Sequence, residues 1–187
     1  MTLNRLKGEK MVYITTYNSI LGKLLLASKN NKLIGVWLEN QKYYLGDLKN
    51  SKEDIKVKDN EEILVKTKNW LDRYFNKEKP DICELDILLS GSFFRKEVLK
   101  ILCTIPYGST MTYEEISKKV AKKLGKDKMS AQAVGGAVGH NPISIIIPCH
   151  RVVGKNGSLT GYAGGIDNKI KLLEHENIDT SKFYIPK

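Results

Sequence analysis

The chain has 187 residues and a formal net charge of +10, from 31 Lys and Arg against 21 Asp and Glu. Hydrophobic residues make up 41% and charged residues 28%, which is typical of a globular protein with one domain or two small ones. This composition excludes collagen-like, mucin-like and fully disordered chains. No apolar run approaches the ~20 residues that a bilayer span needs, so we expect no membrane-spanning segment.

The number and spacing of the cysteines indicate whether the protein resides in an oxidising or a reducing compartment. Cys83, Cys103 and Cys149 cannot all pair within one chain, and their wide spacing matches no zinc motif. No apolar segment follows the basic residues of positions 1–10, so we expect no secretory signal. These features predict a reduced, cytoplasmic protein without a structural metal, in which any cysteine chemistry comes from a thiol.

The positive charge is concentrated in the C-terminal half. Residues 1–92 carry 16 basic and 13 acidic side chains, and residues 93–187 carry 15 basic and 8 acidic ones, so the net charges are +3 and +7. A basic surface suits contact with phosphates and steers polyanions toward the protein. A lysine-rich surface that serves only solubility has the same counts, and charge alone does not distinguish the two.

The first half predicts a small sheet and one helix. Three β-rich stretches separated by turn residues indicate an antiparallel meander: residues 12–17, 21–27 and 33–38. Residues 40–59 are polar and predict loops. Apolar positions from Glu61 to Phe75 recur at helical spacing, and Pro80 ends this predicted helix. Residues 81–91 predict an extended connection to a second domain.

The second half predicts helices. Ser92 can cap a helix that is ended by residues 106–108, and Thr112 with Glu115 forms a capping box for the next one. A short helix rich in small residues can begin at Ser130, and its backbone can approach another surface closely. This order is the outline of a helix-turn-helix, although an ordinary helical hairpin has the same pattern.

Cys149 carries the clearest chemical signal. It follows a buried-type apolar run closed by a proline, and His150 and Arg151 come directly after it. A thiol held beside an imidazole and a guanidinium has surroundings that favour the nucleophilic thiolate. The alternative is a small buried cysteine, which is what Cys83 and Cys103 are expected to be.

Eight strings run in order through residues 92–177: Ser92-Phe93, Pro106-Tyr107-Gly108, Thr112-Tyr113, Ala133-Val134-Gly135-Gly136-Ala137, Gly139-His140-Asn141-Pro142, Pro148-Cys149-His150-Arg151-Val152-Val153, Tyr162-Ala163-Gly164-Gly165 and Leu172-Leu173-Glu174-His175-Glu176. In order and spacing they resemble the O6-alkylguanine-DNA alkyltransferase family. The first half has no comparable motif but is compatible with the family's more variable ribonuclease-H-like domain.

The resemblance implies an α/β plus α fold. A small N-terminal antiparallel-sheet, ribonuclease-H-like domain would occupy residues 1–91, and a mainly helical, winged helix-turn-helix-like DNA-binding domain residues 92–187. It also implies DNA repair by direct reversal, in which the alkyl group on O6 of guanine in double-stranded DNA moves to the protein's own cysteine. Each molecule would act once, as a monomer and without a cofactor, on a nucleotide flipped out of the duplex. Activity on O4-alkylthymine stays open.

The resemblance further implies roles for single residues. Cys149 would be the nucleophile, His150 would accept its proton through a water, and Glu176 would orient and charge-stabilise that imidazole. Tyr113 would hydrogen-bond the flipped guanine. Arg151 would be a structural partner inside the domain. The substrate and DNA surface would include Gln132, Ala133, Gly135, Asn141, Tyr162, Ala163 and Lys169.

Among these residues, Asn141 would tie the DNA-binding turn to the active-site loop. Tyr162 to Gly165 would form the loop over the alkyl group, with Lys169 behind it. Without the resemblance, Glu176 is an acidic residue near a helix end, Tyr113 a core aromatic and Asn141 part of an ordinary Asn-Pro turn.

Two departures from the family pattern stand out. Gln132 occupies the position where the family commonly has an arginine that enters the base stack, and the zinc ligands of some relatives are missing. Three other functions compete with repair. An alkyltransferase-like protein that only flags damage would lack the acceptor cysteine, a thiol hydrolase would use Cys149 and His150 repeatedly, and a helix-turn-helix regulator would bind DNA without chemistry.

Overall fold

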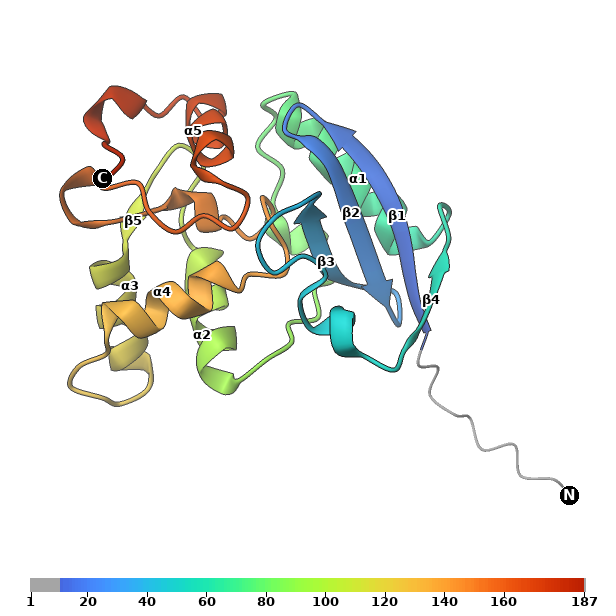
Figure 1. The fold of residues 1–187 in the computed structure, drawn as a ribbon, viewed down its shortest axis with the longest axis horizontal. Coiled ribbons are helices and arrows are strands. Elements are labelled where there is room, and N and C mark those ends of the chain that lie inside the picture. Colours follow the sequence, from blue (N-terminus) through green and yellow to red (C-terminus); the bar gives the residue numbers. More distant parts are fainter. Residues whose placement is uncertain (1–10, 187) are drawn as a thin grey trace, which may run out of the picture.

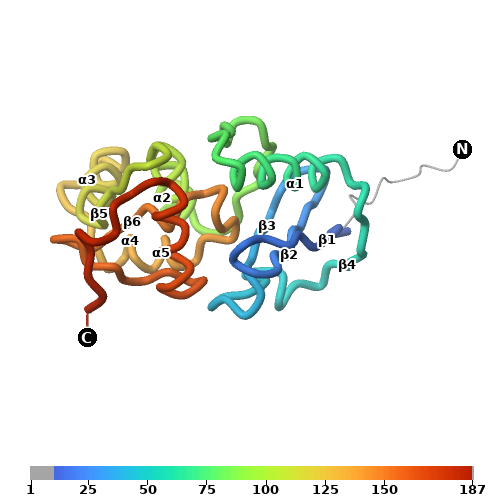
Figure 2. Tube along the Cα trace, turned by 90° about the horizontal axis from the view of Figure 1, so that it is seen from above, coloured from blue at the N-terminus to red at the C-terminus, as the bar shows by residue number. Residues whose placement is uncertain are grey.

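A computed structural model describes residues 11–186 and shows an N-terminal domain with a sheet beside a helical C-terminal domain (Figure 1). Seen from above, the two domains lie side by side along the long axis of the molecule (Figure 2). No helix of the described chain is long and apolar enough to cross a membrane. The expectation about a secretory signal concerns positions 1–10, which lie outside the described residues.

Four strands of the described chain form the N-terminal sheet, in the order β3-β2-β1-β4: β1 (Met11–Ser19), β2 (Gly22–Lys29), β3 (Lys32–Leu38) and β4 (Asp54–Val57). The first three form the predicted antiparallel meander. β4 pairs with β1 in parallel and lies within residues 40–59, which the sequence predicts to be rich in loops without marking this strand. Its four side chains are all exposed, and only backbone pairing defines it.

Both faces of this sheet are covered. Helix α1 (Glu62–Phe75) lies against one face and buries Leu64 and Leu71 there, as its apolar spacing predicts. On the other face, Trp37 packs with Val12 under residues 44–48. The indole of Trp37 lies across Gly35, where an added Cβ would approach the ring to 1.8 Å, so this packing requires glycine.

The edge of β3 connects the two domains. The amide of Val36 donates to the carbonyl of Pro142 (2.9 Å), and the amide of Ser144 donates to the carbonyl of Val36 (2.9 Å). The predicted connection is also paired, because Leu33 forms a parallel bridge with Ile87. The sheet therefore supports the segment that leads to Cys149.

Four α-helices of the described residues build the C-terminal domain: α2 (Phe93–Leu102), α3 (Tyr113–Lys123), α4 (Ala131–Gly139) and α5 (Ile166–His175). Ser92 caps α2, Thr112 and Glu115 form the predicted capping box of α3, and Ser130 caps α4. α2 ends at Leu102, four residues before the predicted proline, because residues 103–105 continue as a tighter turn.

Short elements complete the fold. Strands β5 (Met111–Thr112) and β6 (Val152–Val153) pair in parallel and tie the start of α3 to the residues after Cys149. The described chain also contains 3-10 turns: η1 (Gly46–Asn50), η2 (Ile82–Glu84), η3 (Cys149–Arg151), η4 (Lys155–Gly157) and η5 (Thr180–Lys182).

Candidate active site

Asn141 fixes the segment that carries Cys149. Its Nδ2 donates to the carbonyl of Ile147 (2.8 Å) and lies 3.1 Å from the Sγ atom of Cys149, while its Oδ1 accepts from the amide of Ile143 (3.0 Å). The intervening apolar run is buried but turns sharply, and Ile145 has a φ of 72°, which is rare for a β-branched residue. Asn141 therefore joins the end of α4 to the cysteine, as the sequence predicts.

Cys149 is almost completely buried, with 4% of its surface exposed. Burial raises the pKa of this thiol, and the hydrogen bond from Asn141 and the charge of Lys169 only partly oppose the rise. The expectation that His150 and Arg151 favour the thiolate through proximity was wrong. Both side chains bind Glu176, so the groups that favour the charged sulfur are Asn141, Lys169 and the backbone of Cys149 and His150.

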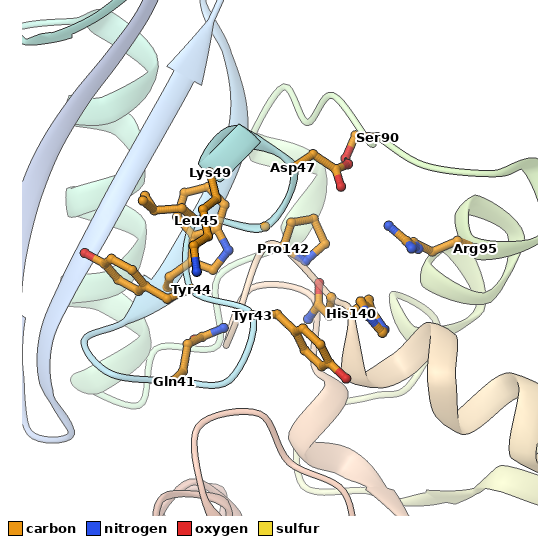
Figure 3. A pocket seen from close by; sticks show the side chains of 13 residues that line it. Gln41, Tyr43, Tyr44, Leu45, Asp47, Lys49, Ser90, Arg95, His140 and Pro142 are labelled. Carbon is orange, nitrogen blue, oxygen red and sulfur yellow. The ribbon is translucent and has the colours of Figure 1, made fainter. Parts of the chain in front are cut away.

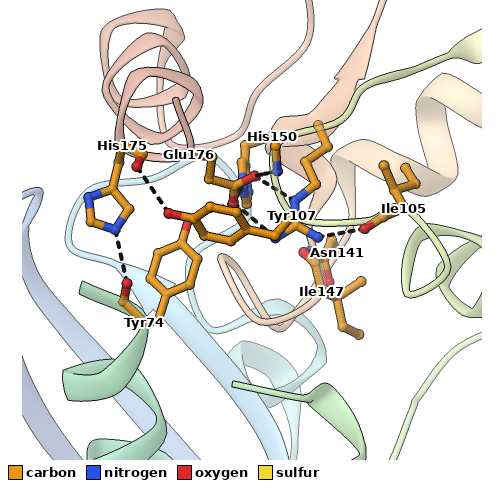
Figure 4. Close-up of polar contacts among 10 residues, drawn as sticks. Tyr74, Ile105, Tyr107, Asn141, Ile147, His150, His175 and Glu176 are labelled. Carbon is orange, nitrogen blue, oxygen red and sulfur yellow. Dashed lines mark hydrogen bonds and ion pairs between the residues drawn. The ribbon is translucent and has the colours of Figure 1, made fainter. Parts of the chain in front are cut away.

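Glu176 is the centre of a buried polar network (Figure 4). Its Oε1 accepts from His150 Nε2 (2.7 Å), Arg151 Nη2 (2.9 Å) and the hydroxyl of Tyr74 (2.7 Å). Its Oε2 accepts from Arg151 Nε (2.8 Å) and the amide of Gly108 (3.2 Å). Burial by itself would raise the pKa of Glu176, but the contacts with His150 and Arg151 outweigh it and lower this pKa to about 2.

This network determines the proton position on His150. An ionised carboxylate can only accept, so Nε2 of His150 carries the hydrogen. Burial lowers the pKa of His150 despite the nearby carboxylate, which favours the neutral imidazole. Nδ1 is buried and has no partner among the described residues, and its lone pair is therefore available to accept a proton.

The sequence predicted one further member of this network, Arg151, but not the other, Tyr74. Arg151 was expected to be a structural partner, and it also donates from Nη1 to the carbonyl of Ile105 (2.6 Å). Tyr74 was not predicted. It lies on α1 in the other domain, 102 residues before Glu176, and nothing in the local sequence separates it from a core aromatic.

Tyr113 stands at a cavity beside α4. Its hydroxyl donates to the carbonyl of Thr160 (3.2 Å), and burial, together with the nearby Cys149, raises its pKa to about 12. The cavity has a volume of about 560 Å³ and is also lined by Gln132, Gly135 and Gly161. Gly161 has a φ of 70°, and an added Cβ there would lie 2.9 Å from the Tyr113 hydroxyl, so only glycine fits.

Lys169 is buried close to the predicted active-site loop. Nζ of Lys169 donates to the carbonyls of Val152 (2.5 Å) and Thr160 (3.0 Å). Burial lowers the pKa of Lys169 to about 8, opposed by the nearby Cys149. Tyr162 is buried, and the carbonyl of Ala163 accepts from the amide of Lys42 in the N-terminal domain (2.9 Å).

The remaining predicted residues lie at the start of α4. Gln132 and Ala133 are exposed, and both of their amides donate to the hydroxyl of Ser130. Gly135 lies against the ring of Tyr113. The structure thus brings these residues to one surface beside the cavity.

The other cysteines differ from the expectation of burial. Cys83 is exposed on the connection between the domains, so the prediction was wrong for this residue, and Cys103 is half-buried at the end of α2. Burial raises the pKa of Cys103 to about 11. Across residues 11–186, no group of three or more His, Cys, Asp or Glu side chains is placed to hold a metal ion.

Comparisons with known proteins agree with this architecture. Two family models match, described as the 6-O-methylguanine DNA methyltransferase ribonuclease-like domain over residues 12–88 and DNA binding domain over residues 93–178. Methylated-DNA–protein-cysteine methyltransferases of Haemophilus influenzae and Methanosarcina acetivorans are 34% and 40% identical to this chain. These matches cover 89% and 88% of this chain and 87% and 98% of the relatives.

Solved structures are similar over nearly the whole chain. The O6-methylguanine methyltransferase of Mycobacterium tuberculosis has a TM-score of 0.71 and 35% identity, covering 94% of this chain and 97% of that one. A structure of the OGT protein of the same organism in complex with DNA has a TM-score of 0.73 and 35% identity, covering 92% and 94%. The chain belongs to the 6-O-methylguanine DNA methyltransferase family.

Proposed function

We propose that this protein repairs DNA by moving the alkyl group of O6-alkylguanine to Cys149, once per molecule. The observation that carries the proposal is a buried cysteine followed directly by a histidine whose Nε2 is bound to an ionised Glu176 and whose Nδ1 is unpaired among the described residues. The relatives named as methylated-DNA–protein-cysteine methyltransferases support it.

The chemistry is a displacement at a saturated carbon. Nδ1 of His150 accepts the proton of the Cys149 thiol through a water, and Glu176 stabilises the imidazolium that forms. The sulfur then bonds to the alkyl carbon while the bond from that carbon to O6 breaks. The departing guanine takes the electron pair, and the protonated hydroxyl of Tyr113 donates a hydrogen bond to it. The thioether product does not hydrolyse, so turnover stops after one transfer.

The buried position of Cys149 requires the substrate base to leave the duplex. Small residues on α4, including Ala133 and Gly135, would allow its backbone to enter the minor groove, with Gln132 at the position of the flipped base. The net charge of +7 on residues 93–187 favours this contact with phosphates. The structure of a relative in complex with DNA supports DNA as the partner, and base flipping from a duplex implies the double-stranded form.

The surrounding residues hold this arrangement. Asn141 links the DNA-binding helix to Cys149, and Lys169 holds the carbonyl of Thr160, which precedes the loop of Tyr162 and Ala163 proposed to lie over the alkyl group. We also assign the protein to the cytoplasm as a monomer. All of the groups that act on the substrate come from one chain, and a reducing compartment preserves the acceptor thiol.

Intact-mass measurement after incubation with an oligonucleotide containing O6-methylguanine tests the proposal. We expect one added methyl group per protein molecule, located on Cys149 by peptide mapping, and no further reaction with excess substrate. Multiple turnover would indicate a hydrolase, and DNA binding without an adduct would indicate a regulator. An adduct on Cys83 or Cys103 would refute the assignment of the nucleophile.

A further inference from the structure

A second cavity, of about 440 Å³, lies between the two domains (Figure 3). Its walls come from residues 41–49 after β3, from Arg95 on α2 and from His140 at the end of α4. The groups proposed to react or move protons (Cys149, His150, Glu176 and Tyr113) do not line it. The cavity shares Asn141 with the segment that carries Cys149, but no step of the proposed repair reaction takes place in it.

The wall of this cavity contains an unsatisfied hydrogen-bond donor. Trp37 is only 2% exposed, and its Nε1 has no hydrogen-bond partner among the described residues. The close contact with Gly35 holds the indole in place, so the donor cannot turn toward solvent without disturbing β3. This nitrogen exposes less than 1 Å² of surface, so the indole forms a rigid support beneath the cavity and its N–H does not reach a ligand there.

The charge around the cavity favours an anion. Arg95 and Lys49 line it, and neither forms a salt bridge with a carboxylate within residues 11–186. Asp47 is the single acidic residue of the lining, and its Oδ2 already accepts from the hydroxyl of Ser90 (2.8 Å). Figure 3 shows Arg95 and Asp47 on the same side of the cavity, with Lys49 across from Arg95. Two unpaired cations therefore face one engaged carboxylate.

The cavity also offers flat aromatic surfaces. The ring of Tyr43 stacks on His140 with centroids 3.9 Å apart and an interplanar angle of 27°. Nζ of Lys42 also lies over this ring, 5.1 Å from its centroid, so a base that stacks there takes the place of this lysine. Tyr43 is 41% exposed, and Tyr44 is half-buried in the adjoining wall. Aromatic faces of this kind stack on nucleobases with little regard to sequence. A planar group joined to an anion matches the lining better than an anion alone.

We propose that this cavity binds a nucleotide, with its base against Tyr43 and its phosphate toward Arg95 and Lys49. The nucleotide could belong to an unpaired end of bound DNA or be free in solution, since the recognised chemistry is the same. The location suits DNA, because His140 ends the helix that we propose enters the minor groove. Tyr43 and His140 also line the neighbouring cavity of about 380 Å³ beside the active-site loop.

Tryptophan fluorescence can test this directly, because Trp37 and Trp70 are the two tryptophans of the chain. Nε1 of Trp70 donates to the carbonyl of Asp81 on another part of the surface, so a Trp70→Phe variant leaves Trp37 as the single reporter. The probes are thymidine monophosphate, a blunt undamaged duplex and the same duplex with an unpaired thymidine overhang. We expect saturable quenching by thymidine monophosphate or by the overhang, beyond any effect of the blunt duplex.

Matched charge variants locate the site. Arg95→Gln should raise the apparent dissociation constant by about tenfold, because it removes one charge-assisted contact. Lys96→Gln removes the same charge from the next position of α2, which does not line the cavity, and should leave the constant unchanged. Calorimetric titration of the unmodified chain and of both charge variants repeats the comparison without the Trp70 substitution.

Each outcome of these titrations either supports or refutes the proposed nucleotide site. Quenching by thymidine monophosphate supports a site open to free nucleotides, and quenching by the overhang alone supports the same site with DNA as the source. Absence of saturable binding, or binding that Arg95→Gln does not weaken, overturns the inference. Intact-mass measurement of alkyl transfer on the same samples keeps the two proposals apart, since loss of either activity leaves the other measurable.

Discussion

Replacing Glu176 with glutamine removes the negative charge at the centre of the buried network while preserving its shape. The folded environment lowers the pKa of this carboxyl from 4.5 to about 2. A shift of that size corresponds to ~3 kcal/mol of preference for the charged form over the neutral one. At pH 7 the glutamine variant should therefore lose ~3 kcal/mol of unfolding free energy, because Arg151 is left without its countercharge.

The pH dependence of this loss follows from the direction of the shift. A carboxyl with a depressed folded pKa contributes its full stability above the unfolded value of 4.5, and the contribution falls as the pH drops toward about 2. At pH 3 only ~1 kcal/mol of it should remain. Urea unfolding of wild type and Glu176→Gln at pH 7 and pH 3 measures the two differences. A loss of equal size at both pH values, or no loss at pH 7, would refute the reasoning.

A control lies on the same helix. Glu174 is exposed and accepts only from the hydroxyl of Thr180 (2.9 Å), so Glu174→Gln should change stability by less than ~0.5 kcal/mol at either pH. The rate of reaction with free O6-benzylguanine gives a second readout. A glutamine amide can donate to Nε2 of His150 and place the hydrogen on Nδ1, which should slow transfer by ~10²–10⁴-fold. An unchanged rate would show that the proton does not pass through Nδ1.

Three further outcomes are expected. Cys149→Ala should abolish adduct formation but keep duplex affinity within a factor of about two, because the side chain of Cys149 is buried behind α4. A large loss of affinity in a filter-binding assay would contradict this prediction. Gln132→Arg should speed single-turnover transfer from duplex DNA by about tenfold, because an arginine gains a charge-assisted phosphate contact during base flipping. The rate with free O6-benzylguanine should not change. Equal effects on both substrates, or no effect on either, would show that Gln132 takes no part in base flipping. Affinity for undamaged duplex should fall steeply as salt rises, and a flat response would mean that the basic excess of residues 93–187 is only a solvated surface.

Local elements were predictable wherever the sequence contains a local physical signal. Alternation and turn residues predicted the three-stranded meander, and helical spacing predicted α1. The capping box of Thr112 and Glu115 set the start of α3. β4 was missed because its alternation of polar and apolar residues spans only four positions within a strongly charged stretch, and all four side chains are exposed. The domain boundary after residue 91 stays a prediction.

The candidate site was also predictable only in part. The motif around Cys149 predicted which residues gather there, and Asn141, Glu176 and Lys169 all lie within this buried region. The order of residues along the chain did not reveal, however, which groups lie close enough to influence the charge of Cys149. His150 and Arg151 follow Cys149 directly, yet the 3-10 turn of residues 149–151 sends both side chains to Glu176.

By itself, the sequence determined the inventory of reactive groups, the local helices and strands, and the family. Tertiary structure decided their charge states and partners. The pKa of Glu176 depends on donors from His150, Arg151 and a tyrosine of the other domain, and the pKa of Cys149 depends on how completely the surrounding chain excludes water. These quantities arise from distances across the fold and from desolvation, because electrostatic energy depends on separation and dielectric surroundings and not on position along the chain.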